Sequence, residues 1–364
     1  MILDPENIPG KRTGQSDPYS HYKAAHHRER LDLLRRGEMI NPVYAEIDLT
    51  NACNLDCSFC SYRVGNYSLD QIREFNPADR LETKRVFELL EEMKKAGVKA
   101  IEWSGGGEPN MHRDWKEIVQ RAKEMDYEQA LVTNGTLLGE DGSRAIRDFE
   151  WTRFSVDAAK ERTYFKIKKR PFLEATLKNI ERLVRIKTPR NIVGFSFVVC
   201  RENYSEIHEA AKIAKNIGAN NVRFSLAYTP EGREMFKGIW DETVEQIGKA
   251  KQEQTKDFTV FAFPNRINEL SQRTKCDGCY FDEFVVTIGA NGAVYPCCLL
   301  KYDPEFNLGN LNEQSFKEIW FGNKRKEFVK RVRRAGCGHS CWMTDKNDFV
   351  GYLLAESPRH VNFF

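Results

Sequence analysis

Three closely spaced cysteines are the residues of this chain best suited to chemistry. Cys53, Cys57 and Cys60 follow the pattern C-x3-C-x2-C. Three thiolates can hold three irons of a cubane iron–sulfur cluster and leave the fourth iron without a protein ligand. Because structural clusters usually have four cysteines, the pattern indicates an iron kept open for a small molecule. A zinc site and buried structural cysteines are the alternatives for the motif alone.

The segments that must position these thiols alternate between strands and helices. Apolar residues at i, i+3 and i+4 predict the helices, and the alternation predicts a parallel sheet with right-handed crossovers. The predicted strands are 44–49, 98–103, 128–133, 151–156, 192–200 and 220–226, and the predicted helices are 82–96, 113–125, 173–187, 204–217 and 240–254. This order predicts an α/β fold, a partial (β/α)6 TIM-like barrel whose first strand leads straight into the three cysteines.

Polar, glycine-containing turns follow three successive predicted strands. The turns read SGGGEP at 104–109, TNGT at 133–136 and FSVDA at 154–158. In α/β barrels the reactive groups gather at the C-terminal ends of the strands. A glycine-rich turn alone indicates only a tight βα connection, but its repetition beside a cysteine motif predicts one shared site.

The cysteine spacing and the Gly-Gly-Glu turn together resemble the radical S-adenosylmethionine (SAM) superfamily. Members of that family hold a [4Fe–4S] cluster on three cysteines and bind SAM to the fourth iron. They cleave SAM reductively to a 5′-deoxyadenosyl radical, which abstracts a hydrogen from the substrate. The resemblance implies that Cys53, Cys57 and Cys60 hold such a cluster here.

The same resemblance assigns parts of SAM to residues of this chain. Glu108 and the two glycines before it contact the amino group, and Phe59 lies against the adenine. Asn134 either organises its turn or touches SAM. The SAM carboxylate needs a cation, for which Lys168 is our choice, although its run 166–170 equally fits a solvated helix face. The implied cofactor-binding residues are Phe59, Gly106, Gly107, Glu108, Asn134, Ser155, Asp157 and Lys168.

The chain changes character at about residue 270, where cysteines become frequent. Asn291-Gly292 stands between two apolar runs, 284–288 and 293–295, and therefore predicts a β-hairpin. A helix is predicted at 313–333. Cys279 and Cys297 follow the pattern C-x12-G-x4-C. These features resemble the auxiliary-cluster domain of the SPASM and twitch subfamilies, a small cysteine-rich domain built from a hairpin and a helix.

That resemblance implies one auxiliary [4Fe–4S] cluster. Its implied ligands are Cys279, Cys297, Cys337 and Cys341, with Cys276 as an alternative ligand. Cys298 is off the pattern and could pack as a small apolar residue. A zinc site is the alternative for this region, because paired cysteines also suit tetrahedral thiolate binding. The expected organisation is an N-terminal extension at 1–43, the barrel at 44–268, the auxiliary domain at 269–348 and a tail at 349–364.

Cys200 stands alone at the end of the fifth predicted strand. If this strand end faces the barrel mouth, its thiol could donate a hydrogen atom to a substrate radical, as in radical epimerases. A cysteine packed inside the protein is the alternative, since buried free cysteines are common.

Composition limits the partners of this chain. Its formal net charge is only +3, well below that of dedicated nucleic-acid binders, which argues against a nucleic-acid substrate. No apolar run approaches the ~20 residues that span a bilayer, and residues 1–7 do not resemble a signal peptide. We therefore expect a cytoplasmic protein, in which clustered cysteines bind metal more often than they form disulfides.

These observations together predict a radical SAM oxidoreductase or epimerase. An auxiliary cluster near the substrate favours dehydrogenation, whereas hydrogen donation by Cys200 would favour epimerisation. We expect a small polar metabolite, such as a sugar or aminocyclitol, and a flavodoxin- or ferredoxin-like electron donor. The main alternatives are a peptide substrate and a non-catalytic zinc or iron–sulfur interaction module. The module explains the cysteine pairs but not the three polar strand ends.

Overall fold

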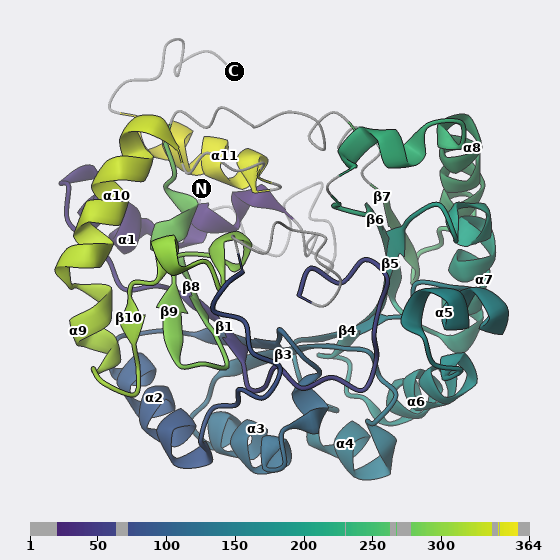
Figure 1. Cartoon of the computed structure of the whole chain (residues 1–364), viewed down its shortest axis with the longest axis horizontal. Coiled ribbons are helices and arrows are strands. Elements are labelled where there is room, and N and C mark those ends of the chain that lie inside the picture. Colours follow the sequence, from purple (N-terminus) through teal and green to yellow (C-terminus); the bar gives the residue numbers. More distant parts are fainter. Residues whose placement is uncertain are drawn as a thin grey trace, which may run out of the picture. The chain divides into compact units, whose positions relative to one another are not determined.

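A single sheet of ten strands runs through residues 41–341, in the order β10-β9-β8-β1-β2-β3-β4-β5-β6-β7 (Figure 1). The computed structural model describes residues 20–62, 72–229, 231–262, 267, 278–336, 341 and 343–355. In this order, every neighbouring pair from β8 through β1 to β7 is parallel. Strands β9 and β10 extend the sheet beyond β8 with antiparallel pairing. Because the order starts at β10 and stops at β7, the barrel is open, as the sequence predicted.

The strands agree with the sequence prediction to within two residues wherever one was predicted. Their bounds are β1 Tyr44–Asp48, β2 Ala100–Ser104, β3 Glu128–Thr133, β4 Trp151–Ser155, β5 Ile192–Val199, β6 Asn221–Leu226, β7 Thr259–Ala262, β8 Val285–Ile288, β9 Ala293–Tyr295 and β10 Gly309–Asn310. Strand β7 was not predicted. It adds a further parallel strand beyond the six expected units.

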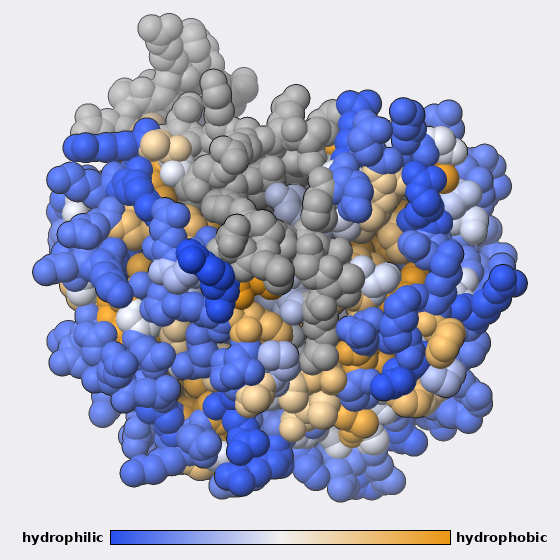
Figure 2. All heavy atoms as spheres, viewed as in Figure 1, coloured by the Kyte–Doolittle hydropathy of each residue, from blue (hydrophilic) through white to orange (hydrophobic). Residues whose placement is uncertain are grey.

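Helices cover the outer face of this sheet (Figure 1). Their bounds are α2 Thr83–Lys95, α3 Trp115–Glu124, α4 Gly139–Ala145, α5 Glu161–Lys168, α6 Leu173–Ile186, α7 Ile207–Ile217 and α8 Trp240–Lys251. Their hydrophilic side chains gather over the rim of the face shown in Figure 2. Alternation along β1 sets the two faces of the sheet: Ala45 and Ile47 pack into the helix-covered core, so Tyr44, Glu46 and Asp48 point to the opposite face. We call the space on that side the barrel lumen.

The cysteine-rich region joins the barrel sheet directly. Strand β8 pairs in parallel with β1, and the predicted hairpin is confirmed by the antiparallel pairing of β8 with β9. Two helices follow, α9 (Phe316–Trp320) and α10 (Asn323–Ala335), where the sequence predicted one. Gly322 separates them, because a β-carbon there would press against the Glu318 carbonyl oxygen at 2.7 Å.

The described residues among 1–40 and 342–364 form a separate compact unit. Its described elements are η1 (His21–His26), α1 (Arg28–Arg35) and α11 (Thr344–Leu354). The rings of Tyr22 and Phe349 meet edge to face at 5.1 Å, and the guanidinium of Arg35 donates to the Leu353 carbonyl at 2.7 Å. The predicted barrel at 44–268 lies in the other unit, residues 41–341, whereas the predicted auxiliary domain at 269–348 extends past the end of that unit at Cys341. None of the helices in the described part of the chain is long and apolar enough to span a membrane.

Candidate functional site

The three-cysteine loop begins where β1 ends and is fastened to the last turn of α5. The Asp56 and Ser58 amides donate to the carbonyl oxygens of Lys168 and Ile167, at 3.2 and 2.8 Å. Cys53, Cys57 and Cys60 are all partly buried and in the thiol state. The loop is therefore held by backbone hydrogen bonds, which do not involve its three sulfurs.

The three thiols of the loop influence one another electrostatically. Burial raises the pKa of Cys57 to about 11, and the neighbouring Cys60 and Cys53 contribute to the rise. Three thiolates on one loop suit a cubane cluster, in which each of them would bind a different iron.

Gly106 and Gly107 pack directly against the residues that lead into this loop. The Gly107 amide donates to the Thr50 carbonyl at 3.1 Å. A β-carbon on Gly107 would overlap the Ala52 carbonyl, and one on Gly106 would overlap the Asn51 side chain. Close backbone approach therefore explains both glycines, independently of any contact with SAM.

Glu108 is a buried carboxylate that joins the ends of β2 and β3. It accepts hydrogen bonds from the Thr133 hydroxyl at 2.6 Å and from the backbone N–H of Asn134 at 2.7 Å. Burial raises the pKa of Glu108, while these two hydrogen bonds oppose the rise. A buried carboxylate favours a nearby cation. The chemistry of Glu108 therefore fits the cationic amino group of SAM, and the contact between them stays a prediction.

Asn134 contacts the three-cysteine loop itself. Its side-chain amide donates to Asn54 Oδ1 at 2.9 Å and lies 4.0 Å from Cys53 Sγ. Asn54 in turn donates to the Thr136 hydroxyl at 2.8 Å. The β3 turn and the cluster loop are thus joined through two amide side chains.

Lys168 and Asp157 form a buried ion pair beneath the loop. Burial opposes the charge on Lys168, but Asp157 and then Cys57 raise its pKa above the ordinary value. The ammonium group also lies 5.6 Å from the centre of the Phe59 ring. Because Asp157 already neutralises Lys168, this lysine suits the support of the loop better than the pairing of a ligand carboxylate.

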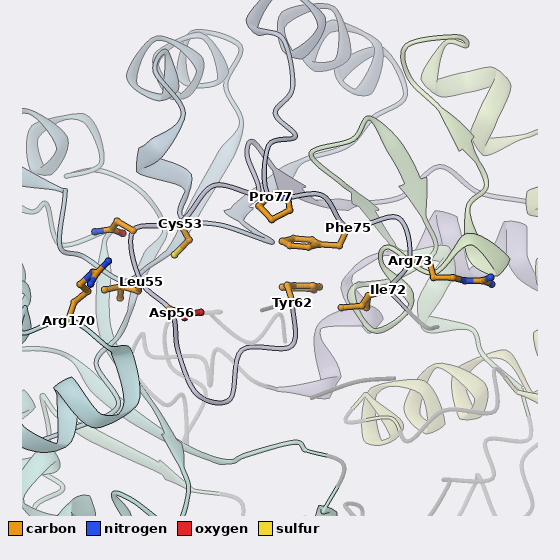
Figure 3. A pocket seen from close by; sticks show the side chains of 10 residues that line it. Cys53, Leu55, Asp56, Tyr62, Ile72, Arg73, Phe75, Pro77 and Arg170 are labelled. Carbon is orange, nitrogen blue, oxygen red and sulfur yellow. The ribbon is translucent and has the colours of Figure 1, made fainter. Parts of the chain in front are cut away.

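An open cavity of about 690 Å³ lies beside Cys53 (Figure 3). Figure 3 shows Cys53 and Arg170 on one side of it and the parallel rings of Tyr62 and Phe75 on the other. Arg170 is exposed and lines the cavity, whereas Lys168 does not line it. Arg170 is thus the cation of the 166–170 run that has access to a ligand beside the first cysteine.

The remaining predicted residues of the barrel lie in two environments. Ser155 ends β4, is partly buried and pairs in register with Ser196 of β5. Cys200 is only 2% exposed and packs with Ile167 and Ala227 in a small apolar cluster. Burial raises the pKa of the Cys200 thiol, and these contacts favour a packing role.

The auxiliary cysteines also approach one another. Cys279, Cys297 and Cys341 are partly buried thiols, and the pKa of Cys279 is raised by burial, by Asp282 and then by Cys297 and Cys341. The Cys279 amide donates to the Val332 carbonyl of α10 at 3.3 Å. The predicted ligands Cys276 and Cys337 lie outside the described residues.

A buried arginine supports the segment that carries Cys279. Arg325 is fully buried and pairs with Asp282 at 2.9 Å and with Glu283 at 3.3 Å. Glu283 also pairs with Arg333, at 2.6 Å. The segment after Cys279 is therefore fixed to α10 by charge as well as by its backbone.

The lumen between the two cysteine regions is lined by charged side chains. Glu46 and Glu102 are register partners on β1 and β2, and the Tyr44 hydroxyl hydrogen-bonds to both. Burial and then Glu102 raise the pKa of Glu46 to about 7, while Lys301 opposes the rise and the Cys298 thiol hydrogen-bonds to its carboxylate. The auxiliary segment thus reaches the same lumen as β1.

Sequence reasoning missed these lumen residues, although a signal was present. Tyr44, Glu46 and Asp48 alternate with apolar residues in β1, and charged residues on one face of a buried strand indicate a polar interior. Nothing comparable marked Lys301, which comes from a distant segment.

The fold is an open, mostly parallel α/β barrel, and three thiols follow its first strand. Together these features define the class of α/β barrels that hold an iron–sulfur cluster at the end of the first strand. Residues 47–214 match the radical SAM superfamily, and residues 276–342 match SPASM, an iron–sulfur cluster-binding domain. The chain therefore carries a radical SAM domain and a SPASM domain. Its cofactors are SAM, a [4Fe–4S] cluster and an auxiliary cluster.

Curated relatives of this chain have diverse activities. The tungsten-containing aldehyde ferredoxin oxidoreductase cofactor-modifying protein of Pyrococcus furiosus is 24% identical over 332 residues, which are 84% of this chain and 89% of that protein. The PqqA peptide cyclase of Gluconobacter oxydans is 25% identical over 288 residues, 77% and 76% of the two chains.

Solved structures share the fold at low sequence identity. SuiB of Streptococcus suis, bound to S-adenosylmethionine, has a TM-score of 0.64 at 14% identity and covers 85% of this chain and 72% of its own. The structure of anSMEcpe with bound AdoMet has a TM-score of 0.58 at 16% identity, with coverage of 80% and 84%.

Proposed function

We propose that this radical SAM enzyme oxidises a polar substrate by two electrons within the lumen. The observation that supports this most is the buried ion pair of Lys301 with Asp48 at 2.6 Å, because it brings the segment that follows Cys297 to the lumen wall. When bound, SAM and its cluster supply hydrogen abstraction, and the auxiliary cluster supplies an acceptor for the remaining electron. Cys53, Cys57 and Cys60 would hold the first cluster, and Cys279, Cys297, Cys337 and Cys341 the second.

The chain's own part is to bind the substrate and take up its proton. Removal of a hydrogen atom and then of an electron leaves one proton to be released. The Glu46 carboxylate has a pKa of about 7, which lets it exchange a proton near neutral pH. We therefore assign Glu46 as the general base, held by the Tyr44 hydroxyl at 3.4 Å.

The SAM site would combine the residues of three strand ends. Glu108 fits the amino group of SAM because it is a buried carboxylate, and Phe59 fits the adenine. We assign the SAM carboxylate to Arg170, which lines the cavity beside Cys53, in place of Lys168. Gly106, Gly107, Asn134, Ser155 and Asp157 would shape the rest of that site.

A small polar metabolite is the substrate class that the lumen favours. Glu46, Glu102 and Arg153 line it, and Arg153 lies 3.9 Å from Glu102, so hydroxyl and amino groups would find hydrogen-bond partners there. Oxidation is favoured over epimerisation because Cys200 is packed among apolar side chains. A peptide is the second candidate substrate, because one relative is the PqqA peptide cyclase.

The experiment is anaerobic reconstitution with iron and sulfide, followed by reduction in the presence of SAM. We expect about eight irons per chain, since two [4Fe–4S] clusters are proposed, and production of 5′-deoxyadenosine that is lost in Cys53→Ala. Polyols, amino sugars and short peptides then serve as substrates, with a reduced flavodoxin as donor. At saturating SAM, Cys297→Ser should retain SAM cleavage but lose substrate oxidation. Zinc in place of iron, or iron without SAM cleavage, would contradict the proposal.

A further inference from the structure

The end of β1 and the segment after β9 meet at one buried carboxylate oxygen. Asp48 is fully buried, and its Oδ2 accepts hydrogen bonds from the Gly106 amide at 2.9 Å and from the Tyr302 hydroxyl at 2.8 Å. The ammonium group of Lys301 pairs with the same oxygen at 2.6 Å. The glycine turn, the first strand and the auxiliary segment are therefore joined at a single atom.

Tyr302 reaches beyond Asp48 to the three-cysteine loop. Its hydroxyl lies 2.6 Å from Asn51 Oδ1, two residues before Cys53. The side-chain amide of Asn51 donates to the Asn76 carbonyl at 2.9 Å, so this side chain is fixed at both ends. A tyrosine from the auxiliary segment thus orients the residue from which the cluster loop starts.

The Tyr302 backbone is held in an unfavourable conformation to make these contacts. Its φ is +64°, in the left-handed region that residues with a β-carbon rarely adopt. Its carbonyl accepts from the Glu74 amide at 3.0 Å, and its ring meets Phe75 edge to face at 5.2 Å. Strained residues persist where surrounding contacts over-determine them, and they gather at functional sites.

Lys301 and Tyr302 follow closely on an auxiliary cysteine. Only the short 3-10 helix Cys298–Leu300 separates Cys297 from Lys301 in sequence. A displacement of Cys297 therefore displaces Lys301 through a single turn of backbone. Lys301 is itself confined, because its ammonium group lies 5.1 Å from the Tyr62 ring centre and its side chain is 4% exposed. Both residues contact Asp48 Oδ2, so a shift of either one changes the contacts of that carboxylate.

We propose that Asp48, Lys301 and Tyr302 couple the auxiliary cluster site to the three-cysteine loop. They act as positioning residues: a filled auxiliary site holds Tyr302 on Asn51 and thereby holds the loop in the geometry that binds SAM. A coupling of this kind is reciprocal, so SAM binding at the first site must in turn favour a filled auxiliary site.

The test is a mutant cycle on the reconstituted full-length enzyme. SAM affinity is measured by titration, and the reduced first cluster is followed by electron paramagnetic resonance. We expect Tyr302→Phe, which removes only the hydroxyl, to weaken SAM binding at least fivefold, the lower end of typical couplings, and to shift the g values. Cys297→Ser alone should also weaken SAM binding and shift the g values. Combined with Tyr302→Phe, it should cause no further change in either quantity.

Tyr127→Phe is the matched control. Its hydroxyl donates to the Leu90 carbonyl at 2.6 Å in the helix-covered core, so it loses a comparable buried hydrogen bond at a site away from both cysteine regions. Equal spectra and SAM affinities for Tyr302→Phe and Tyr127→Phe would overturn the proposal, as would additive effects of Tyr302→Phe and Cys297→Ser. Lys301→Gln gives the second variant if Tyr302→Phe does not fold.

A second readout needs neither SAM nor substrate. Amide hydrogen exchange of the reconstituted protein, measured without SAM, should be at least fivefold faster in residues 50–60 of Tyr302→Phe than in wild type, and unchanged there in Tyr127→Phe. Unchanged exchange in both variants would remove the proposed link. Because no step of this test uses the substrate, its outcome is independent of the reaction proposed above.

Discussion

The side-chain amide of Asn134 donates a hydrogen bond to Asn54 Oδ1 at 2.9 Å, so the end of β3 fixes the second residue of the cysteine motif. Asn54 is itself bound to Thr136. This contact positions the loop whether or not Asn134 also touches SAM.

Replacement of Asn134 by alanine should therefore weaken iron binding as well as folding. We expect a loss of about 1–3 kcal/mol in the free energy of unfolding, because partners of a buried hydrogen-bonding group are left unsatisfied, and a lower iron content after gel filtration. Asn191→Ala is the control. Its side-chain amide donates to the Ile146 carbonyl at 2.8 Å. This bond lies at the N-terminal ends of the strands, opposite to the ends that carry Asn134 and the cysteine loop. Equal iron contents in the two variants would contradict this role.

Gly107→Ala should disrupt the cluster loop directly. The added methyl group would overlap the Ala52 carbonyl, and overpacking of this kind costs about 1–3 kcal/mol. Iron content and unfolding by denaturant measure the two effects. Gly248→Ala on α8 is the matched substitution, since no atom lies within 4 Å of its β-carbon position. It should stabilise the protein by about 0.5–1 kcal/mol, and a similar loss in both variants would refute the steric explanation.

The buried pair of Lys168 and Asp157 predicts a strong asymmetry between single and double variants. Lys168→Met leaves the Asp157 carboxylate buried without its cation, which costs about 3–5 kcal/mol. The double variant Lys168→Met/Asp157→Asn removes both charges and should recover much of that loss. Lys166→Met, exposed on the same helix, should change the free energy of unfolding by about 0.5 kcal/mol or less. Denaturant unfolding distinguishes these outcomes, and a double variant no better than the single one would contradict the pairing.

Glu46 should make the folded protein less stable as pH rises. Its folded-state pKa is raised from 4.5 to about 7 by burial and Glu102, while Lys301 opposes the rise. The folded state therefore binds more protons than the unfolded state between these values, and stability falls as pH increases across that window. Asp48 and Cys298 also face this carboxylate.

Glu46→Gln should remove that part of the pH dependence. Denaturant unfolding at pH values from 5.5 to 8 would show a smaller loss of stability with rising pH than in wild type. Glu128→Gln, exposed at the start of β3, should leave the wild-type dependence intact. A wild-type pH profile in Glu46→Gln would show that this carboxyl titrates normally.

The barrel could be predicted from the sequence because its information is local. Strands such as 128–133 and helices such as 173–187 were found from the spacing of apolar residues, and the structure agrees with them closely. Helices α4 and α5 were missed, because the first contains two glycines and a serine and the second reads as a charged run. Such helices are stabilised by tertiary packing rather than by their own periodicity.

The parts of the site that were missed depend on pairings between distant segments. Nothing in the residues 285–288 indicates that β8 pairs with β1. That pairing brings Lys301 to Asp48. The two residues are far apart in sequence, and local residue patterns carry no information about contacts at such a distance. Arg170 and Lys168 could not be told apart by spacing, because burial alone separates them.

Cys200→Ala distinguishes oxidation from epimerisation. Cys200 packs with Ile167 and Ala227, and the partly buried Phe59 and Met235 lie against that cluster. Removal of the sulfur should therefore cost about 1 kcal/mol through lost apolar contact and leave the rate and stereochemistry of the product unchanged once a substrate is identified. Chiral analysis of the product and the incorporation of solvent deuterium at the reacting carbon are the measurements. Loss of an inverted product, with SAM cleavage retained, would instead establish the thiol as the hydrogen donor, because no other step needs a hydrogen atom returned to the substrate.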